Sequence, residues 1–176
     1  MENFTITKEH LNEKNEYIGS EDLSSFEGNL IAEEDLGHIK FRSLKIKGYI
    51  LFKAGSGIEA GEGIEAGLGI EAGWSIEAGS GIEAGWSIEA GSGIEAGSGI
   101  EAGSGIKAGS GIKAGLSINC KILSTNLRIF AGLCIWKLPK KEEMQIICEK
   151  LERGTICFGE LVLTKENEHG KNTYDF

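Results

Sequence analysis

Between residues 55 and 119 the apolar positions recur with a period of six. Each unit has an isoleucine, then in nearly every case a charged residue and an alanine, with glycine, serine or an occasional larger residue between. The isoleucines are Ile58, Ile64, Ile70, Ile76, Ile82, Ile88, Ile94, Ile100, Ile106, Ile112 and Ile118. A short and strict period indicates one structural unit that stacks on copies of itself.

This period matches neither the 3.6-residue repeat of a helix nor the simple alternation of a long strand. Nineteen of the 27 glycines lie between residues 55 and 115, where they bound each Ile-Glu-Ala triplet. Short strands that turn at glycine, with each coil bonded to the next at ~4.8 Å, account for the spacing. The sequence therefore predicts an all-β, single-stranded β-helix (β-solenoid) of hexapeptide repeats, with isoleucine and alanine facing inward.

The run Gly55-Ser56-Gly57-Ile58-Glu59-Ala60-Gly61 and its successors resemble the hexapeptide-type β-helix class. They are also similar to bactofilins, cytoskeletal β-helices that polymerise end to end. The resemblance covers residues 44–119 and implies a three-sided coil of eighteen residues; a flatter, two-sided coil of twelve is the alternative. The left-handed acyltransferases of this class carry a small residue two positions before the aliphatic one. Five units of this chain carry a larger residue there, namely Glu62, Leu68, Trp74, Trp86 and Leu116, which leaves handedness open.

The flanking sequence predicts four parts: a polar N-terminal segment and cap (1–43), the solenoid (44–119), C-terminal capping strands (120–164) and a flexible tail (165–176). Thr7 is the expected N-cap of a short helix. Ile46 and Phe52 lie twelve and six residues before Ile58, which predicts that the solenoid begins over 44–52.

At the other end, residues 145–151 and 155–163 are rich in β-forming side chains on either side of Glu152-Arg153-Gly154. This pattern predicts a β-hairpin, with a short helix over 141–151 as the alternative. Either element would cover the end of the solenoid, where unpaired backbone is otherwise exposed.

Charge follows the same period. The chain has a net charge of −9, and residues 54–119 contain nine glutamates and two lysines. With eighteen residues per coil the glutamates form three columns: Glu59, Glu77 and Glu95; Glu65, Glu83 and Glu101; Glu71 and Glu89. Lys107, Lys113 and Asn119 end these columns.

Like charges ~4.8 Å apart repel by about 0.9 kcal/mol even in water, so the columns are not an optimum for stability alone. Three carboxylates per coil give one charge per ~1.6 Å of axis, close to the value of about 1.7 Å for B-DNA. This spacing favours a nucleic-acid mimic that binds a basic partner. A solvated surface without a binding role is the alternative.

The position two before each isoleucine holds serine, glutamate, leucine or tryptophan. A packed interior does not accept such different volumes, so we expect this position at a solvent-facing corner. Trp74, Trp86 and Leu68 are then candidate contact residues, because exposed tryptophan is typical of binding hot spots. In the alternative, both tryptophans pack under a terminal segment.

Catalytic chemistry is not indicated. Hexapeptide acyltransferases need a histidine beside the coils and related carbonic anhydrases need three, but His10, His38 and His169 lie outside the repeat. The cysteines, at 120, 134, 148 and 157, include no C-x-x-C pair and are expected to be reduced thiols, with 148 and 157 facing each other across the hairpin. We expect no metal, no cofactor and no enzyme activity.

The first residues show no basic region followed by an apolar run, so we expect a cytoplasmic protein. The leading hypothesis is an inhibitor that presents its acidic, tryptophan-bearing face to a basic nucleic-acid-binding protein. A phage-borne inhibitor of a CRISPR or restriction nuclease would have such a surface. Direct binding to nucleic acid or to a membrane is not expected. A self-assembling structural protein that joins through its ends or edges is second, and an acyltransferase-like enzyme third.

Overall fold

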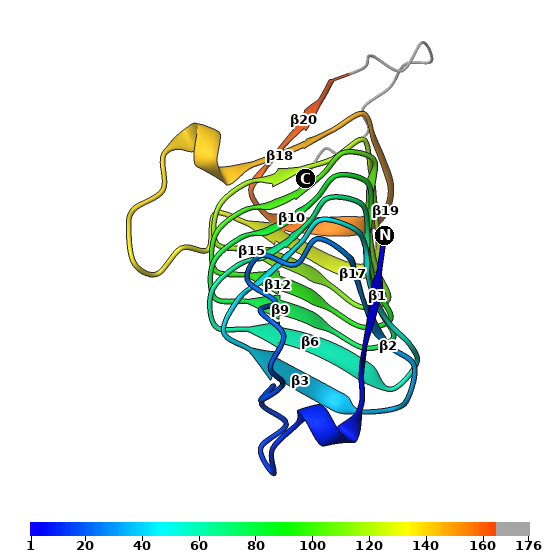
Figure 1. Ribbon diagram of the computed structural model, residues 1–176. Helices are drawn as coiled ribbons and strands as arrows, with labels where there is room; N and C mark the ends of the chain where they lie inside the picture. The colour runs from blue at the N-terminus through cyan, green and yellow to red at the C-terminus, as the bar shows by residue number, and fades with distance from the viewer. Residues whose placement is uncertain (165–176) are drawn as a thin grey trace.

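The computed structural model describes residues 1–164, which form a parallel β-solenoid (Figure 1). The predicted all-β solenoid is confirmed. Its strands pair side by side with those of the next coil in three ladders, and ladder 3 has seven strands in the described residues.

Ladder 1 contains β1 (Asn3–Ile6), β2 (Asn29–Ala32), β5 (Ile50–Phe52), β8 (Ile70–Ala72), β11 (Ile88–Ala90) and β14 (Gly105–Ala108). Ladder 2 contains β3 (Gly37–Phe41), β6 (Ser56–Ala60), β9 (Ile76–Ala78), β12 (Ile94–Ala96) and β15 (Ile112–Ala114). Ladder 3 contains β4 (Leu44–Ile46), β7 (Ile64–Ala66), β10 (Ile82–Ala84), β13 (Ile100–Ala102), β16 (Ile118–Asn119), β18 (Gln145–Cys148) and β20 (Glu160–Leu163). The long strand β17 (Ile122–Ala131) pairs with both β14 and β15, and β19 (Lys150–Phe158) pairs with β17.

The register within the repeat is eighteen residues. Ile82 pairs with Ile64 on one side and with Ile100 on the other. A twelve-residue coil would instead pair Ile82 with Ile70 and Ile94, so the two-sided alternative is excluded.

The core consists of stacked columns of isoleucine and alanine. All eleven repeat isoleucines are at most 1 % exposed, and the alanines that follow them are buried too, as predicted. Burial of each isoleucine contributes about 1.5–3 kcal/mol, which explains how strands of three residues hold a regular coil.

The two glycine positions of a corner differ in the space that they leave for a side chain. A Cβ at Gly79 would lie 2.2 Å from the carbonyl oxygen of Gly61 in the preceding coil, whereas one at Gly81 would lie 3.4 Å from the nearest atom. The first position therefore excludes any side chain. The second tolerates one, and Ser75 and Ser87 occupy it.

The expected phase of the first coils is wrong. Leu44 pairs with Ile64, and Ile46 with Ala66, so the register there is twenty residues. Ile46 and Phe52 thus fill alanine positions, because Phe52 precedes Ile58 by six residues, whereas a repeat alanine precedes the next isoleucine by four. Phe41 and Phe52 pack against each other at this end of the core, with ring centroids 6.0 Å apart.

The N-terminal segment covers this end as an irregular coil. After β1, a 3-10 turn η1 (Lys8–His10) follows Thr7, where a helix start was expected. Bridges from Glu16 to Lys40 and from Phe26 to Ile46 then attach the segment to ladders 2 and 3. The ring of Phe4 contacts those of Tyr17 and Phe26, and all three pack against the core.

The predicted C-terminal hairpin is wrong. Residues 145–148 of β18 run parallel to residues 160–163 of β20, and Gly154 lies within β19 rather than at a turn. The β-forming residues continue the ladders, because a solenoid strand gains more from pairing with the coil below than from folding back on its neighbour. Of the alternative helix, only a 3-10 turn η2 (Lys141–Met144) is present.

The ladders therefore extend on both sides of residues 44–119, from β1–β3 to β20. Between β17 and η2 the chain leaves the solenoid in a loop that stands out from its side (Figure 1). The tail at 165–176, for which flexibility was predicted, lies outside the described residues.

Candidate functional site

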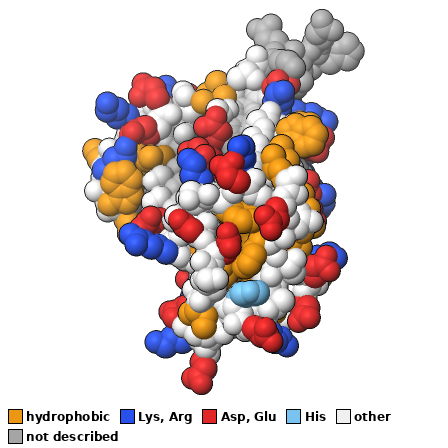
Figure 2. All heavy atoms as spheres, viewed as in Figure 1, with side chains coloured by type: hydrophobic (Ala, Val, Ile, Leu, Met, Phe, Trp, Pro, Cys, Tyr) orange, Lys and Arg blue, Asp and Glu red, His pale blue; other side chains and the backbone are white. Residues whose placement is uncertain are grey.

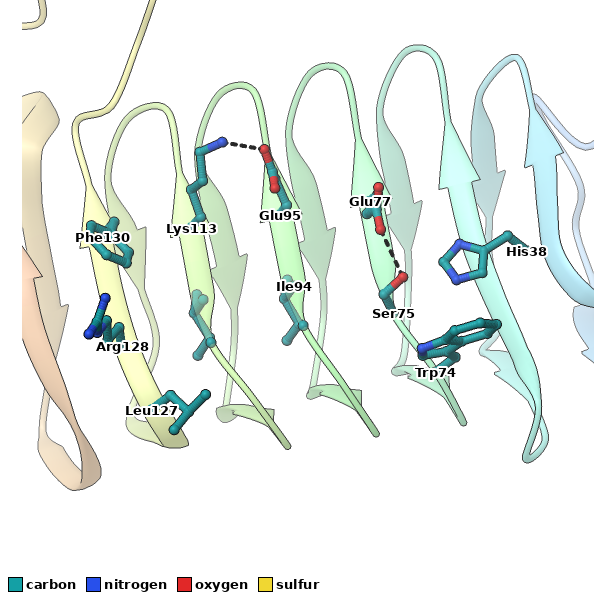
Figure 3. A pocket seen from close by; sticks show the side chains of 13 residues that line it. His38, Trp74, Ser75, Glu77, Ile94, Glu95, Lys113, Leu127, Arg128 and Phe130 are labelled. Carbon is teal, nitrogen blue, oxygen red and sulfur yellow. Dashed lines mark hydrogen bonds and ion pairs between the residues drawn. The ribbon is translucent and has the colours of Figure 1, made fainter.

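A groove runs along the outer surface of ladder 2, across successive strands. It encloses about 690 Å³. His38 and Trp74 stand at one end, and Leu127, Arg128 and Phe130 at the other (Figure 3). Figure 2 shows this face, with hydrophobic side chains in its centre and acidic side chains beside them. We call this feature the ladder 2 groove.

The length of the groove follows from the residues that occupy one corner in successive coils. Trp74, Ser92, Ser110 and Leu127 occupy the same corner in successive coils, and the N–H of each of the last three donates to the carbonyl of the one before. Trp74 and Leu127 are three coils apart, a separation of about 14 Å. The serines between them are too small to fill the space, so the two large side chains form the ends of a trench.

The floor is a column of small residues that ends in two larger ones. Gly57, Ser75, Gly93 and Gly111 follow one another between His38 and Arg128. The His38 ring meets Trp74 edge-on, with ring centroids 4.4 Å apart and planes at 73°. Gly57 permits this contact, since a Cβ there would lie 3.3 Å from the His38 ring.

The outward side chains of the strands form the charged wall. Glu77 and Glu95 come from β9 and β12, and Lys113 comes from β15. Ser75 Oγ donates to Glu77 Oε1 at 2.9 Å, and Lys113 Nζ donates to Glu95 Oε1 at 2.5 Å. The groove is thus acidic towards Trp74 and basic towards Leu127, where Arg128 adds a second cation.

These groups suit a cationic ligand with an apolar part. A guanidinium or ammonium group can lie against an indole ring and bond a carboxylate at the same time. An extended peptide rises by 3.2–3.4 Å per residue, so about four residues span the groove. Residues 1–164 contain no group of three or more His, Cys, Asp or Glu side chains arranged to hold a metal ion.

The predicted glutamate columns are present, one on each of the three ladders, as the eighteen-residue coil requires. Ladder 2 carries Glu59, Glu77 and Glu95; ladder 3 carries Glu65, Glu83 and Glu101; ladder 1 carries Glu71 and Glu89. Their C-terminal neighbours are Lys113, Asn119 and Lys107, as predicted. The role of these glutamates in binding a partner stays a prediction.

Two columns also end in lysine on the N-terminal side, which the sequence did not indicate. Lys40 Nζ lies 3.8 Å from Glu59, and Lys45 Nζ lies 2.8 Å from Glu65. The hydrogen bond to Glu65 raises the pKa of Lys45. Unpaired acidity is consequently concentrated in the middle coils.

The two tryptophans lie on different corners. Trp86 and Leu68 occupy adjacent coils between ladders 3 and 1, and the Trp86 N–H donates to the Leu68 carbonyl at 2.8 Å. Trp86 is 69 % exposed and Trp74 is 47 % exposed, so the expected exposure is confirmed and neither is covered by a terminal segment. Their role as contact residues stays a prediction.

Sequence reasoning missed the residues that form the ends of the groove, apart from Trp74: His38, Leu127, Arg128 and Phe130. The cause is a change of register, because Ile112 pairs with Ile129, seventeen residues on, rather than eighteen. One signal was available. Leu123 and Ile129 are also six residues apart, one position out of phase with the repeat, and both are fully buried.

All four cysteines are free thiols, but Cys148 is buried and Cys157 is exposed, so they do not face each other as expected. Cys120 instead lies near Cys148 in the core. Burial, with the neighbouring Cys148, raises the pKa of the Cys120 thiol to about 12. This thiol is therefore protonated and unreactive at neutral pH.

Comparison of the chain with protein-family models, with curated proteins and with solved structures gave no match. Within residues 1–164, no helix is both long and apolar enough to cross a membrane.

Proposed function

We propose that this protein is a non-enzymatic binding protein whose ladder 2 groove receives a basic, extended segment of another protein. The observation that carries the proposal is the composition of the groove. One trench about 14 Å long combines an exposed indole beside the Glu77 carboxylate with the Glu95–Lys113 ion pair and a far end formed by Leu127, Arg128 and Phe130, over a floor of small residues.

Each part has a role in recognition. An arginine or lysine of the ligand stacks on Trp74, whose ring is supported by His38, and bonds to Glu77. The Ser75 hydroxyl holds that carboxylate in place before the ligand arrives, which reduces the entropy lost on binding. An apolar side chain of the ligand then packs against Leu127 and Phe130.

A fluorescently labelled peptide of alternating arginine and leucine, measured by anisotropy, tests this proposal. Trp74→Ala and the pair Glu77→Gln/Glu95→Gln should each weaken binding by about tenfold or more, as expected for central contact residues. Added salt should weaken it further, because exposed charges are screened.

The repeat offers matched controls. Trp86→Ala changes the same residue type in the same six-residue unit on another corner. Glu83→Gln/Glu101→Gln changes the same Ile-Glu-Ala triplet on another face. They should alter the affinity by less than about twofold. If control and groove variants lose equal affinity, binding follows overall acidity and the groove has no special role.

A second candidate is the nucleic-acid mimic. It is supported by the density of carboxylates around the middle coils, where ladders 1 and 3 add five glutamates to the three of ladder 2. Such a protein would compete with DNA for a basic DNA-binding protein or nuclease. Reversal of Glu71, Glu83 and Glu89 to lysine should abolish that competition and leave the ladder 2 groove intact. Competition that survives this reversal in a folded protein would exclude mimicry.

A further inference from the structure

The loop that leaves the solenoid after β17 exposes apolar side chains to an unusual degree. Ile135 is 99 % exposed, Leu138 is 94 % exposed and Trp136 is 61 % exposed. Residues 133–141, here the 133–141 loop, also contain Lys137, Lys140 and Lys141 and no acidic residue. Scattered exposed apolar residues are ordinary, but three within four positions of one projecting loop indicate a contact surface.

Contacts within the same region shape this loop. Lys137 Nζ lies 2.5 Å from Glu143 and 5.1 Å from the centre of the Trp136 ring. Lys141 Nζ lies 3.4 Å from Glu160 at the start of β20. Among residues 1–164, Lys140 Nζ has no ion pair, so its charge is available to a partner.

We propose that the 133–141 loop of one copy of the chain binds in the ladder 2 groove of a second copy. This inference rests on the proposed function of the groove and names its occupant. The groove offers an indole beside the Glu77 carboxylate, the Glu95–Lys113 ion pair and an apolar end next to Arg128. The loop offers the Lys140 ammonium group beside isoleucine, tryptophan and leucine. The chain thus carries both halves of one complementary contact, on different parts of its surface.

The apolar side chains of the 133–141 loop are not buried by the solenoid of their own chain, because the loop stands away from the ladders (Figure 1). A reciprocal arrangement, in which each copy gives its loop and receives the other's, would close as a dimer with two identical contacts. An anionic membrane is a weaker candidate for the loop, since the nine glutamates of residues 54–119 would oppose its approach.

Sedimentation velocity from micromolar to millimolar concentration tests the proposal with the full chain. The wild type should associate. Association should weaken by about tenfold or more in a loop variant, Ile135→Ser/Leu138→Ser, and in a groove variant, Glu77→Lys/Glu95→Lys. The control Glu83→Lys/Glu101→Lys, on ladder 3, should associate like the wild type, and circular dichroism should show that all variants keep the β-solenoid.

A charge exchange makes the test specific. Lys140→Glu/Lys141→Glu and Glu77→Lys/Glu95→Lys should each associate about tenfold or more weakly than the wild type when alone, and their association should recover when the two are mixed, because opposite charges face each other again. A simple loss of folding or solubility cannot produce this rescue.

Three results would overturn the proposal: a wild type that stays monomeric at every concentration, association that no loop or groove variant weakens, or a monomer whose loop binds phosphatidylserine vesicles. The labelled arginine–leucine peptide separates the two proposals. If it binds the groove of a monomeric chain, the proposed function stands and only the self-association is refuted. If it does not bind at all, the proposed function fails as well.

Discussion

Residues 73–78 and 85–90 have the same sequence, Gly-Trp-Ser-Ile-Glu-Ala, and the same backbone pattern, yet they lie in different surroundings. Trp74 contacts His38 and stands at one end of a groove. Trp86 lies next to Leu68 on another corner and is more exposed. The comparison teaches that a repeat unit determines its own conformation, while the coils on either side determine what it can bind.

Substitutions in the core should lower the stability by the same amount in the two units. Ile76→Ala and Ile88→Ala each remove a fully buried side chain from a stacked column, and each should lower the free energy of unfolding by about 2–5 kcal/mol. Urea denaturation measures both values. Unequal losses beyond the error of the method would show that the units differ in their packing as well as in their surface.

The first glycine of each unit should be equally intolerant. A Cβ at Gly73 would lie 2.4 Å from Ala54 Cα, and one at Gly85 would lie 2.1 Å from the Gly67 carbonyl oxygen. Gly73→Ala and Gly85→Ala should therefore each cost about 1–3 kcal/mol of stability by overpacking. Gly93→Ala is the control, since its nearest contact would be 3.5 Å away, and it should unfold at nearly the wild-type urea concentration.

The two tryptophans should differ in how much they contribute to stability. Trp74→Ala loses an edge-on aromatic contact with His38 and should be less stable than Trp86→Ala by about 0.5–1.5 kcal/mol. His38→Ala should remove this difference, because Trp74 then has no ring partner. Equal stabilities of the two tryptophan variants in the presence of His38 would contradict the contact.

An effect of similar size is expected at the serines that follow the two tryptophans. Ser75 Oγ bonds Glu77, whereas Ser87 makes no side-chain hydrogen bond to Glu89 within residues 1–164. Ser75→Ala should cost about 0.5–1.5 kcal/mol and weaken peptide binding a few-fold, since Glu77 is no longer held. Ser87→Ala should change neither quantity. A loss of affinity in both variants would mean that the hydroxyl acts without orienting the carboxylate.

The sequence predicted the regular part of the fold because a single local rule repeats there. Ile82 must pair with Ile64 and Ile100 once eighteen residues make a coil, and the glutamate columns follow from the same register. It failed where the spacing changes. Two extra residues between Phe52 and Ile58 put Phe52 in an alanine column, and the shorter coil before Ile129 hid the position of Leu127.

The hairpin prediction was wrong for a similar reason. Strand-forming residues such as Ile146 and Ile156 indicate that a segment pairs, but not with which neighbour. In this fold the preceding coil offers a ready parallel edge at β16 and β17, so β18 and β19 extend the ladders.

By itself, the sequence determined the β-solenoid, its inward isoleucines and the vertical spacing of its charges, because these depend on contacts one coil apart. The tertiary structure alone decided that Trp74 shares a groove with His38 and Leu127. The physical reason is distance along the chain: His38 lies before the repeat, Leu127 lies after it, and only the accumulated register of several irregular coils brings them to the same face.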